Sequence, residues 1–455
     1  MIKKTLLSAV ILLLVFAFSP SLADEYRENL YIFERDGYYG YMDYEHNIVI
    51  PPNWGKAYPL KNGLALVWLN DEAELPSNNG LIDTNGLYII PPCYLIEECE
   101  SSYIYSIVKG DSLLYGFYDK STGFLMPPTY EYVCDNSSEG NNETGFIEVQ
   151  LNEKWGFCRR SDGTLVIPCI YDEVLESFSN GYALVCTGLE KPSPLGFYDR
   201  YDLIDCLGNR IGINSNVMPV SAPSSDGTFI IMGRVMHKES LYDGINTNNI
   251  MYGIADVEGD IIVEPTYVII GSFVDNLAWF CNQDMKWGVM DANGCVVIEP
   301  KYEVEQNYEF QPVYFVNGYA VRQLVDNELI IVDEIGKETL LNLNMLEIGN
   351  VSQVLPNTTM LVYSVENDSA NDCGFIDVKG NVLTEAVYSN WYDVSENMIR
   401  VRKNGKYGFI DKNGQEVIPC IYDDAYDFVN STACVKLDGS ILYINHEGTV
   451  VWNSQ

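Results

Sequence analysis

The segments KYGFIDKNGQEVIPCIY (residues 406–422), KWGFCRRSDGTLVIPCIY (154–171) and KWGVMDANGCVVIEPKY (286–302) carry one pattern at three distant places in the chain. In each, an aromatic residue and a glycine open a short apolar run. A polar turn with a second glycine follows, and a second apolar run leads through a proline to a tyrosine. Internal similarity of this kind is the signature of a repeat architecture. The fold can therefore be predicted from the number of repeat units and from the secondary structure of a single unit.

Further copies fill nearly the whole chain. Aligning them on the glycine that lies three residues before the turn acid gives eleven anchor positions, 34 to 57 residues apart. The anchors are Gly40, Gly80, Gly116, Gly156, Gly196, Gly253, Gly288, Gly374 and Gly408, with Ile330 and Leu442 in two degenerate units. The longest step predicts a loop-rich insertion at residues 212–250, between an N-terminal array (24–211) and a C-terminal array (251–455).

Each unit predicts short antiparallel strands. The aromatic–Gly run alternates like a strand. The Asp-x-Asn-Gly turn after it, as at residues 411–414, indicates a hairpin because Asn and Gly tolerate positive φ. The turn aspartate can accept hydrogen bonds from nearby backbone N–H groups. A third apolar run, such as GLALVW at 63–68, completes a predicted three-stranded meander, and no segment after residue 23 shows helical periodicity with caps.

These units resemble the WG repeat, also called the KWG repeat, of bacterial proteins. The resemblance rests on Lys154-Trp155-Gly156 and Lys286-Trp287-Gly288, on Tyr-Gly variants of the same step, on the acid–glycine turn and on the Pro-x-Tyr ending. It extends over residues 24–455 and implies an all-β repeat protein, often secreted or surface-associated, with a poorly characterised function. Gly80 lacks the preceding aromatic residue and Arg159 replaces the turn aspartate, so some units are diverged.

Neighbouring units are expected to bury each other's apolar faces, because one unit cannot do so alone. The array can close as a β-propeller-like ring or run as an open solenoid. Since propellers typically have about 4–8 blades, the eleven units favour the open form, or two sub-arrays divided near residues 212–250. In either form the anchor glycines, Trp155 and Trp287 are expected to be structural, with glycine admitting a close backbone approach.

The first 23 residues have the pattern of a secretory signal peptide. Lys3 and Lys4 precede an uncharged apolar run from Leu6 to Phe18, and Ser21 and Ala23 supply the small residues of a cleavage site. A helix of this run spans only about 20 Å, which is short of the ~30 Å hydrocarbon core of a membrane. The sequence therefore predicts an exported protein, without fixing whether it stays in a periplasm, on a surface or in the medium.

The composition limits the partners. The chain has 64 acidic and 27 basic residues and a net charge of −37. Nucleic acids and anionic membranes repel such a polyanion. Aromatic residues make up 13% of the chain, which excludes a disordered acidic tail. We expect a folded, acidic protein whose partner is another protein or a glycan.

Twelve cysteines leave two interpretations open. Their even number and the predicted export allow a disulfide framework. Many of them, however, occupy positions at which other units carry Val, Ile or Thr, which favours small buried hydrophobic residues. No Cys-x-x-Cys pair is present, so a zinc ribbon or a redox motif is disfavoured.

No catalytic, metal or cofactor motif stands out. The sequence lacks a Gly-x-Ser-x-Gly elbow, a His-Glu-x-x-His motif, a P-loop and a dinucleotide fingerprint. The Asp-x-x-Gly turns have glycine at position 4 of the loop rather than at position 6, unlike an EF-hand. We therefore predict no enzyme activity, no cofactor and no dedicated metal site.

The function class predicted is a secreted, non-enzymatic binding or interaction scaffold. The alternatives are an exported polysaccharide hydrolase, because two carboxylates in a cleft would suffice, and a calcium-responsive structural envelope protein. Tryptophans outside the aromatic–Gly position are candidates for stacking on sugar rings. These are Trp54, Trp68, Trp279, Trp391 and Trp452. Trp68 and Trp279 lie in the third apolar run, which favours a core role, and we take Trp54 and Trp391 as the candidate ligand-stacking residues.

Overall fold

The computed structural model describes residues 29–69, 78–135, 145–188, 199–234, 250–273, 276–303, 315–324, 328–333, 335–342, 350–355, 357–365 and 372–454. Within these ranges the regular structure is entirely β-strand, which confirms the all-β prediction. No helix capable of crossing a membrane occurs in the part of the chain described. The predicted signal peptide (1–23) lies outside the described residues.

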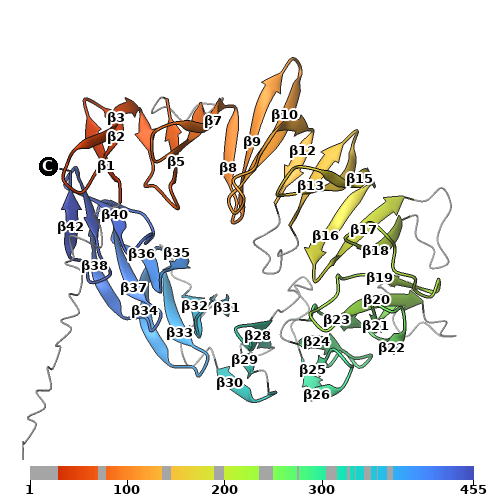
Figure 1. Cartoon of the computed structure of the whole chain (residues 1–455). Coiled ribbons are helices and arrows are strands. Elements are labelled where there is room, and N and C mark those ends of the chain that lie inside the picture. Colours follow the sequence, from red (N-terminus) through yellow and green to blue (C-terminus); the bar gives the residue numbers. More distant parts are fainter. Residues whose placement is uncertain are drawn as a thin grey trace, which may run out of the picture.

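Eleven small antiparallel sheets follow one another around a ring (Figure 1). We number them 1 to 11 in chain order. Sheets 1 to 4 consist of β1 (Tyr31–Arg35), β2 (Tyr38–Met42), β3 (Ile48–Trp54); β4 (Lys56–Ala57), β5 (Leu64–Trp68), β6 (Asn79–Asp83), β7 (Tyr88–Cys93); β8 (Leu95–Glu98), β9 (Ser102–Lys109), β10 (Ser112–Asp119), β11 (Leu125–Tyr130); and β12 (Tyr132–Cys134), β13 (Phe146–Leu151), β14 (Lys154–Arg159), β15 (Leu165–Tyr171).

Sheets 5 to 8 continue the same order of strands. They consist of β16 (Glu173–Ser179), β17 (Tyr182–Gly188), β18 (Asp199–Asp205); β19 (Val217–Pro219), β20 (Thr228–Arg234), β21 (Ile250–Asp256), β22 (Ile261–Tyr267); β23 (Ile269–Ile270), β24 (Leu277–Cys281), β25 (Trp287–Asp291), β26 (Val296–Tyr302); and β27 (Phe315–Val316), β28 (Tyr319–Leu324), β29 (Glu328–Asp333), β30 (Glu338–Asn342).

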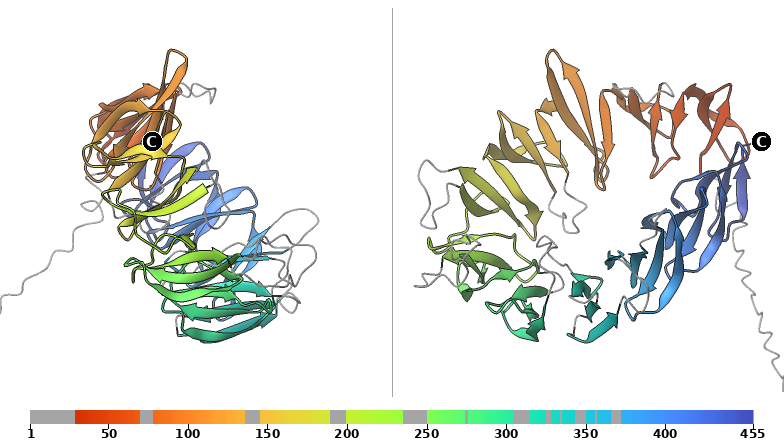
Figure 2. Two further views of the ribbon diagram at one scale, coloured as in Figure 1. Left: turned by 90° about the vertical axis from the view of Figure 1, so that its right-hand side faces the viewer. Right: turned by 180° about the vertical axis from the view of Figure 1, so that it is seen from behind.

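Sheets 9 to 11 complete the ring. They consist of β31 (Asn350–Val354), β32 (Met360–Ser364), β33 (Cys373–Asp377), β34 (Val382–Tyr388); β35 (Asn390–Ser395), β36 (Met398–Lys403), β37 (Lys406–Asp411), β38 (Glu416–Tyr422); and β39 (Asp424–Ala425), β40 (Ala433–Leu437), β41 (Ser440–Ile444), β42 (Val450–Asn453). In each sheet hydrogen-bonded neighbours are also neighbours in sequence, so every sheet is a meander. The first strands lie toward the middle of the ring and the last strands on its outside (Figures 1 and 2).

The repeat in the sequence is out of phase with the sheets. The aromatic–Gly run forms the third strand of a four-stranded sheet, as β14 does in sheet 4, and the run after the turn forms the fourth strand. The chain then crosses to the next sheet, where a short first strand precedes the predicted third apolar run. The predicted three-stranded meander therefore lacks one strand in nine of the eleven sheets, because the strand after the Pro-x-Tyr ending is short.

The anchor glycine faces a bulge in the fourth strand. In sheet 7 the register shifts between Trp287, which pairs with Tyr302, and Val289, which pairs with Ile298. A Cβ atom on Gly288 would lie 2.5 Å from the carbonyl oxygen of Ile298 and 2.9 Å from the nitrogen of Pro300. Backbone contacts too close for a Cβ atom recur at Gly40, Gly116, Gly156, Gly253, Gly374 and Gly408, and the ring of Tyr88 makes a similar contact at Gly80. The predicted close backbone approach is confirmed at these anchors.

The turn aspartates fix the hairpins. Oδ1 of Asp411 accepts hydrogen bonds from the backbone N–H groups of Asn413 at 2.9 Å and Gln415 at 2.8 Å. Gly414 in the same turn has a φ of 79°, which glycine adopts without strain. The same hydrogen bonds form at Asp83, Asp205, Asp291, Asp333 and Asp377.

Sheet 5 corrects one anchor position. The turn lies at Asp205, where Leu207 and Asn209 donate backbone hydrogen bonds to the carboxylate, so the anchor position of this unit is Asp202. Asp202 pairs with Val185, just as Gly156 pairs with Val149 in sheet 4. The anchor predicted at Gly196 is therefore misaligned, and Gly196 itself lies outside the described residues. Asp199 lies three residues after Gly196, and Asp205 lies three residues before Gly208. The sequence therefore offered two candidates for the turn acid of this unit.

Apolar clusters lie between neighbouring sheets and hold the ring together. Trp279 of sheet 7 and Ile330 of sheet 8, for example, belong to one buried cluster. Clusters of this kind join every consecutive pair of sheets, and a further one joins sheet 11 to sheets 1 and 2. The prediction that neighbours bury each other's apolar faces is confirmed.

The preference for an open array or two sub-arrays is wrong. The last sheet packs on the first, and the segment near residues 212–250 does not divide the ring. Its described part supplies β19 and β20, and Phe229 of β20 lies in the cluster that joins sheets 5 and 6. The predicted loop-rich insertion therefore contains two core strands. The open form was preferred because most propellers have fewer than eleven blades. That number does not determine how the sheets of this chain pack against one another.

Candidate functional site

The contact between sheet 11 and sheets 1 and 2, which we call the closing seam, is rich in aromatic side chains. The rings of Tyr31 and Trp452 stack at 4.8 Å, and Tyr443 meets Tyr31 edge-on at the same distance. The hydroxyl oxygen of Tyr443 accepts a hydrogen bond from the backbone N–H of Ile32 at 3.2 Å, across 411 residues of sequence. His46 stacks on the Trp452 ring at 5.2 Å. These contacts bring the two ends of the array together.

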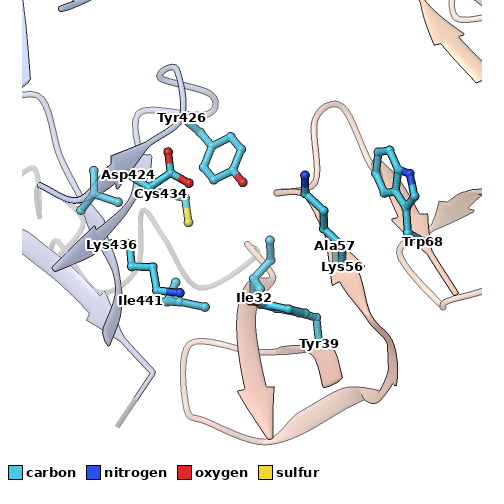
Figure 3. A pocket seen from close by; sticks show the side chains of 11 residues that line it. Ile32, Tyr39, Lys56, Ala57, Trp68, Asp424, Tyr426, Cys434, Lys436 and Ile441 are labelled. Carbon is cyan, nitrogen blue, oxygen red and sulfur yellow. The ribbon is translucent and has the colours of Figure 1, made fainter. Parts of the chain in front are cut away.

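A cavity of about 350 Å³ lies at the closing seam (Figure 3). Sheets 1 and 2 form one wall and sheet 11 forms the other. Its lining consists of Ile32, Tyr39, Lys56, Ala57, Trp68, Asp424, Tyr426, Cys434, Val435, Lys436 and Ile441. Lys56 and Tyr426 extend from opposite walls into the space between them (Figure 3). The cavity exists only because the ring closes, since its two walls lie more than 350 residues apart in sequence.

The two lysines of this cavity form no ion pair within 4.0 Å with any residue the structure describes. Lys436 pairs with Asp424 across the β39–β40 ladder, but the Asp424 carboxylate accepts a hydrogen bond from the N–H of Ala425. Asp423, the acid next to it, bonds to Lys406 and to the N–H of Asp438, and it interacts with Lys436 only at longer range. The Lys56 ammonium lies over the rings of Tyr58 and Trp68, at 5.0 and 5.6 Å. Neither lysine is therefore engaged in a direct ion pair.

A second cavity of about 460 Å³ lies between sheets 2 and 3 and shows the opposite arrangement. It also has two lysines in its lining, Lys61 and Lys120. Both pair with Glu98, at 3.5 and 3.0 Å. The charge of this cavity is thus balanced internally, whereas that of the closing seam is not.

Aromatic side chains and the hydroxyl of the half-buried Tyr426 complete the closing-seam cavity. Tyr426 packs edge-on against Tyr58 at 5.4 Å, and Tyr58 lies 5.1 Å from Trp68. Burial, with a smaller contribution from Asp424, raises the pKa of Tyr426 far above its ordinary value, so its hydroxyl stays protonated. That hydroxyl makes no hydrogen bond to any described residue and is free to donate to a ligand. Burial likewise raises the pKa of the Cys434 thiol to about 12.

The residues selected from the sequence do not form this site. Trp54 is only 4% exposed, and its Nε1 donates a hydrogen bond to the hydroxyl of Tyr88 at 3.0 Å. A ring without an exposed face cannot stack on a sugar, so the prediction for Trp54 is wrong. Trp391 is half-buried on β35 and remains a prediction. Trp68, which was expected in the core, lines the cavity.

Trp155 and Trp287 occupy equivalent positions in sheets 4 and 7. Each pairs with the tyrosine that ends the fourth strand, Trp155 with Tyr171 and Trp287 with Tyr302. Both rings belong to apolar clusters between sheets. This packing fits the structural role predicted for the aromatic–Gly step.

The cysteines do not form a disulfide framework, which agrees with the interpretation of them as small hydrophobic residues. All twelve are free thiols, and six are buried: Cys93, Cys158, Cys186, Cys281, Cys373 and Cys434. Burial raises the pKa of each of these thiols for which a shift is resolved, as at Cys158, where it reaches about 11. Among the described residues, no group of three His, Cys, Asp or Glu side chains is placed to hold a metal ion.

A ring of antiparallel meander sheets with a cavity at its closure defines a β-propeller-like repeat protein. The sequence profile of the "WG containing repeat" matches residues 39–71, 115–155, 155–188, 252–284, 287–304, 374–407 and 407–440. The chain therefore belongs to the WG-repeat family. The anchor positions of sheets 2, 5, 8 and 11 (Gly80, Asp202, Ile330 and Leu442) lie outside the matches, although these sheets have the same strand order as the others.

The solved structures that match this chain are only remotely similar to it. A eukaryotic initiation factor matches with 10% identity and a TM-score of 0.42, over 78% of this chain and 95% of that one. The computationally designed Ika8 protein matches with 11% identity and a TM-score of 0.31, over 68% and 92%. BamB from Moraxella catarrhalis matches with 9% identity and a TM-score of 0.27, over 78% and 92%. No curated protein matches the sequence.

Proposed function

We propose that this WG-repeat protein is an exported, non-enzymatic binding scaffold that takes its ligand in the closing-seam cavity. The single observation that supports this most strongly is the unbalanced charge of that cavity. In a chain with a net charge of −37, this cavity has two half-buried lysines in its lining against one carboxylate, and neither lysine forms a direct ion pair. A ligand or partner that supplies negative charge gives them a role.

The shape of the cavity supports binding. Its volume of about 350 Å³ is at the lower end of the range of roughly 300–1,000 Å³ found for ligand sites. Aromatic walls with a few convergent polar groups are typical of such sites. Trp68, Tyr426 and Lys56 supply these elements from two walls that the ring closure holds in place.

The chemistry of the cavity supports binding rather than catalysis. The thiol of Cys434 has a pKa of about 12 and is therefore a poor nucleophile at neutral pH. Asp424 is the one carboxylate among the lining residues, whereas glycoside hydrolysis needs two. Export is inferred from residues 1–23, and the acidic surface favours a protein or glycan partner over nucleic acid or an anionic membrane.

A panel of glycans and secreted proteins, probed with the full chain and with Trp68→Ala, tests this proposal. Trp68 lines the cavity and is only half-buried, so the variant should fold and lose binding. Trp155→Ala is the matched control, because Trp155 is also half-buried but lies on β14 in sheet 4, away from the cavity. A ligand lost in the first variant and kept in the second supports the proposal. Equal binding by both variants, for every ligand found, would overturn it.

A further inference from the structure

We propose that the ligand of the closing-seam cavity is a carboxylated sugar, namely a uronic acid unit of an acidic polysaccharide. This inference rests on the proposed function and names the chemical class that the cavity recognises. It is carried by three features that meet at one place: two lysines without a direct ion pair, an aromatic wall and a hydroxyl that is free to donate. Each feature matches one part of a uronic acid.

The lysines match the carboxylate. Some lysines of this chain pair with acids, as Lys301 does with Glu338 at 2.9 Å and Lys154 with Asp172. Lys56 and Lys436 form no ion pair within 4.0 Å with a described residue, and both line the same cavity. Their ammonium groups are available to donate charge-assisted hydrogen bonds to a carboxylate that comes from outside.

The aromatic wall matches the sugar ring. A pyranose has an apolar C–H face that packs on an aromatic ring, as other apolar groups do. Trp68 is half-buried and forms one side of the cavity, and Ile32, Ala57 and Ile441 add an apolar floor. The Lys56 ammonium lies 5.6 Å from the centre of the Trp68 ring, so a sugar on this wall would lie close to a cation.

The hydroxyl of Tyr426 matches the sugar hydroxyls. Because burial keeps it protonated, it can donate to a ring or hydroxyl oxygen. Asp424, at the rim of the same wall, can accept from a sugar hydroxyl. An acidic peptide offers a carboxylate but not this combination of a flat apolar face with surrounding hydroxyls. The observations therefore favour an acidic sugar over an acidic peptide.

Binding of matched charged and neutral sugars to the full chain tests this inference. The probes are oligomers of galacturonic, glucuronic and mannuronic acid, each compared by titration calorimetry with its carboxyl-reduced neutral counterpart. We expect at least one acid to bind about tenfold or more tightly than its neutral form, as a charge-assisted contact implies. We also expect its affinity to fall as salt is raised, because salt screens the two lysines.

Variants of the lining residues test whether the preference for the acidic sugar arises in the closing-seam cavity. Replacing both cavity lysines (Lys56→Gln with Lys436→Gln) should reduce the affinity for the acid to that for the neutral sugar. Lys301→Gln, which breaks a surface pair with Glu338, is the matched control and should change nothing. Trp68→Ala should weaken binding of both sugars. Equal melting temperatures of the lysine variants would show that the fold is intact.

The outcomes separate this inference from the proposed function. If every acid and its neutral form bind equally, or if the lysine variant still prefers the acid, the inference is overturned. If only an acidic peptide or another class of ligand binds in a Trp68-dependent way, the inference falls and the binding function stands. If no ligand of any class depends on Trp68, both fall.

Discussion

The closing seam and the seam between sheets 7 and 8 both bury apolar side chains between sheets, but they use different kinds of residue. Between sheets 7 and 8, the buried cluster combines Trp279 and Trp287 with aliphatic side chains such as Val289 and Ile330. At the closing seam the buried cluster contains six large aromatic residues: Tyr31, Phe33, Tyr41, Trp54, Tyr443 and Trp452. It is also the place where the 350 Å³ cavity lies.

The difference follows from chain connectivity. Sheets 7 and 8 are consecutive in sequence, so the backbone keeps them close even when their contact is weakened. The closing seam joins residues as far apart as Ile32 and Tyr443, and no consecutive segment tethers them. Its contacts must offset the entropy of bringing the two ends together. Large aromatic rings suit this task because each buries much area and they stack on one another.

The largest effect is expected from Trp452→Ala at the closing seam. This change removes the ring that stacks on both Tyr31 and His46. Truncation of a buried tryptophan costs about 3–5 kcal/mol of the free energy of unfolding. Because the ends are not tethered, we also expect the ring to open. Small-angle X-ray scattering should show a larger radius of gyration, and thermal denaturation a lower Tm.

Trp279→Ala is the matched variant at the tethered seam. Trp279 is fully buried between sheets 7 and 8, so the loss of stability should be similar. The radius of gyration should stay unchanged, because consecutive sheets remain connected. If both variants keep the same dimensions as the parent chain, connectivity does not explain the difference between the seams.

A somewhat smaller effect is expected from Gly288→Val within sheet 7. Any Cβ atom at residue 288 meets the backbone of Ile298 and Pro300, and backbone cannot move aside as a side chain can. Overpacking of this kind costs about 1–3 kcal/mol, and the closeness of the approach points to the upper part of that range. The free energy of unfolding, measured by chemical denaturation, checks this value.

Sheet 8 supplies the control for this glycine. Ile330 occupies the anchor position there, and β29 pairs with β30 without a register shift. Ile330→Val should therefore cost only about 1 kcal/mol, as a lost methylene group does. A loss for Gly288→Val no larger than that for Ile330→Val would mean that the bulge adjusts to a side chain.

Much of this architecture could be predicted because it depends on local signals. The aromatic–Gly step, the acid–glycine turn and the proline repeat within each unit, and each specifies its own backbone geometry. The short first strands, such as β23 and β39, could not be predicted because two residues carry no periodicity. Closure of the ring could not be predicted either, since it depends on the small angle between successive sheets, which accumulates over eleven of them.

The candidate site was missed for a related reason. Lys56 and Lys436 are unremarkable in their own units, where lysine is an ordinary surface residue of a strand. They become a pair only when sheets 2 and 11 meet across the closing seam. Trp68 was assigned to the core by analogy with Trp279, which is fully buried in the equivalent run of sheet 7. Only the location of Trp68 beside the cavity distinguishes the two.

Acid should have a smaller destabilising effect, similar for the turns beside the closing seam and for those away from it. Hydrogen bonds from Asn47 lower the pKa of Asp43 in sheet 1, and those from Thr164 lower the pKa of Asp162 in sheet 4. A carboxyl group with a lower pKa in the folded state stabilises the fold above its unfolded pKa of about 4. This contribution is lost as the pH falls through the lower, folded value. The Tm should therefore decrease below about pH 4.

The turns offer a direct check of that pH dependence. Asp43→Asn and Asp162→Asn should each make the decrease in Tm slightly less steep, because one titrating group is removed. The two variants should behave alike in direction, since each removes a carboxylate that accepts turn hydrogen bonds, although Asp162 also pairs with Arg159. A steeper decrease for either variant would show that the turn aspartates do not stabilise the folded state.

The smallest effect on stability, and the sharpest test of the cavity, is expected from Tyr426→Phe. The phenylalanine ring keeps the contact with Tyr58, and the lost hydroxyl has no partner among the described residues, so the Tm should hardly change. Ligand affinity should fall about fivefold, because a neutral hydrogen bond contributes roughly 1 kcal/mol. Tyr252→Phe in sheet 6, away from the closing seam, is the control and should leave affinity unchanged. An unchanged affinity in Tyr426→Phe would place the ligand elsewhere than against this wall of the closing seam.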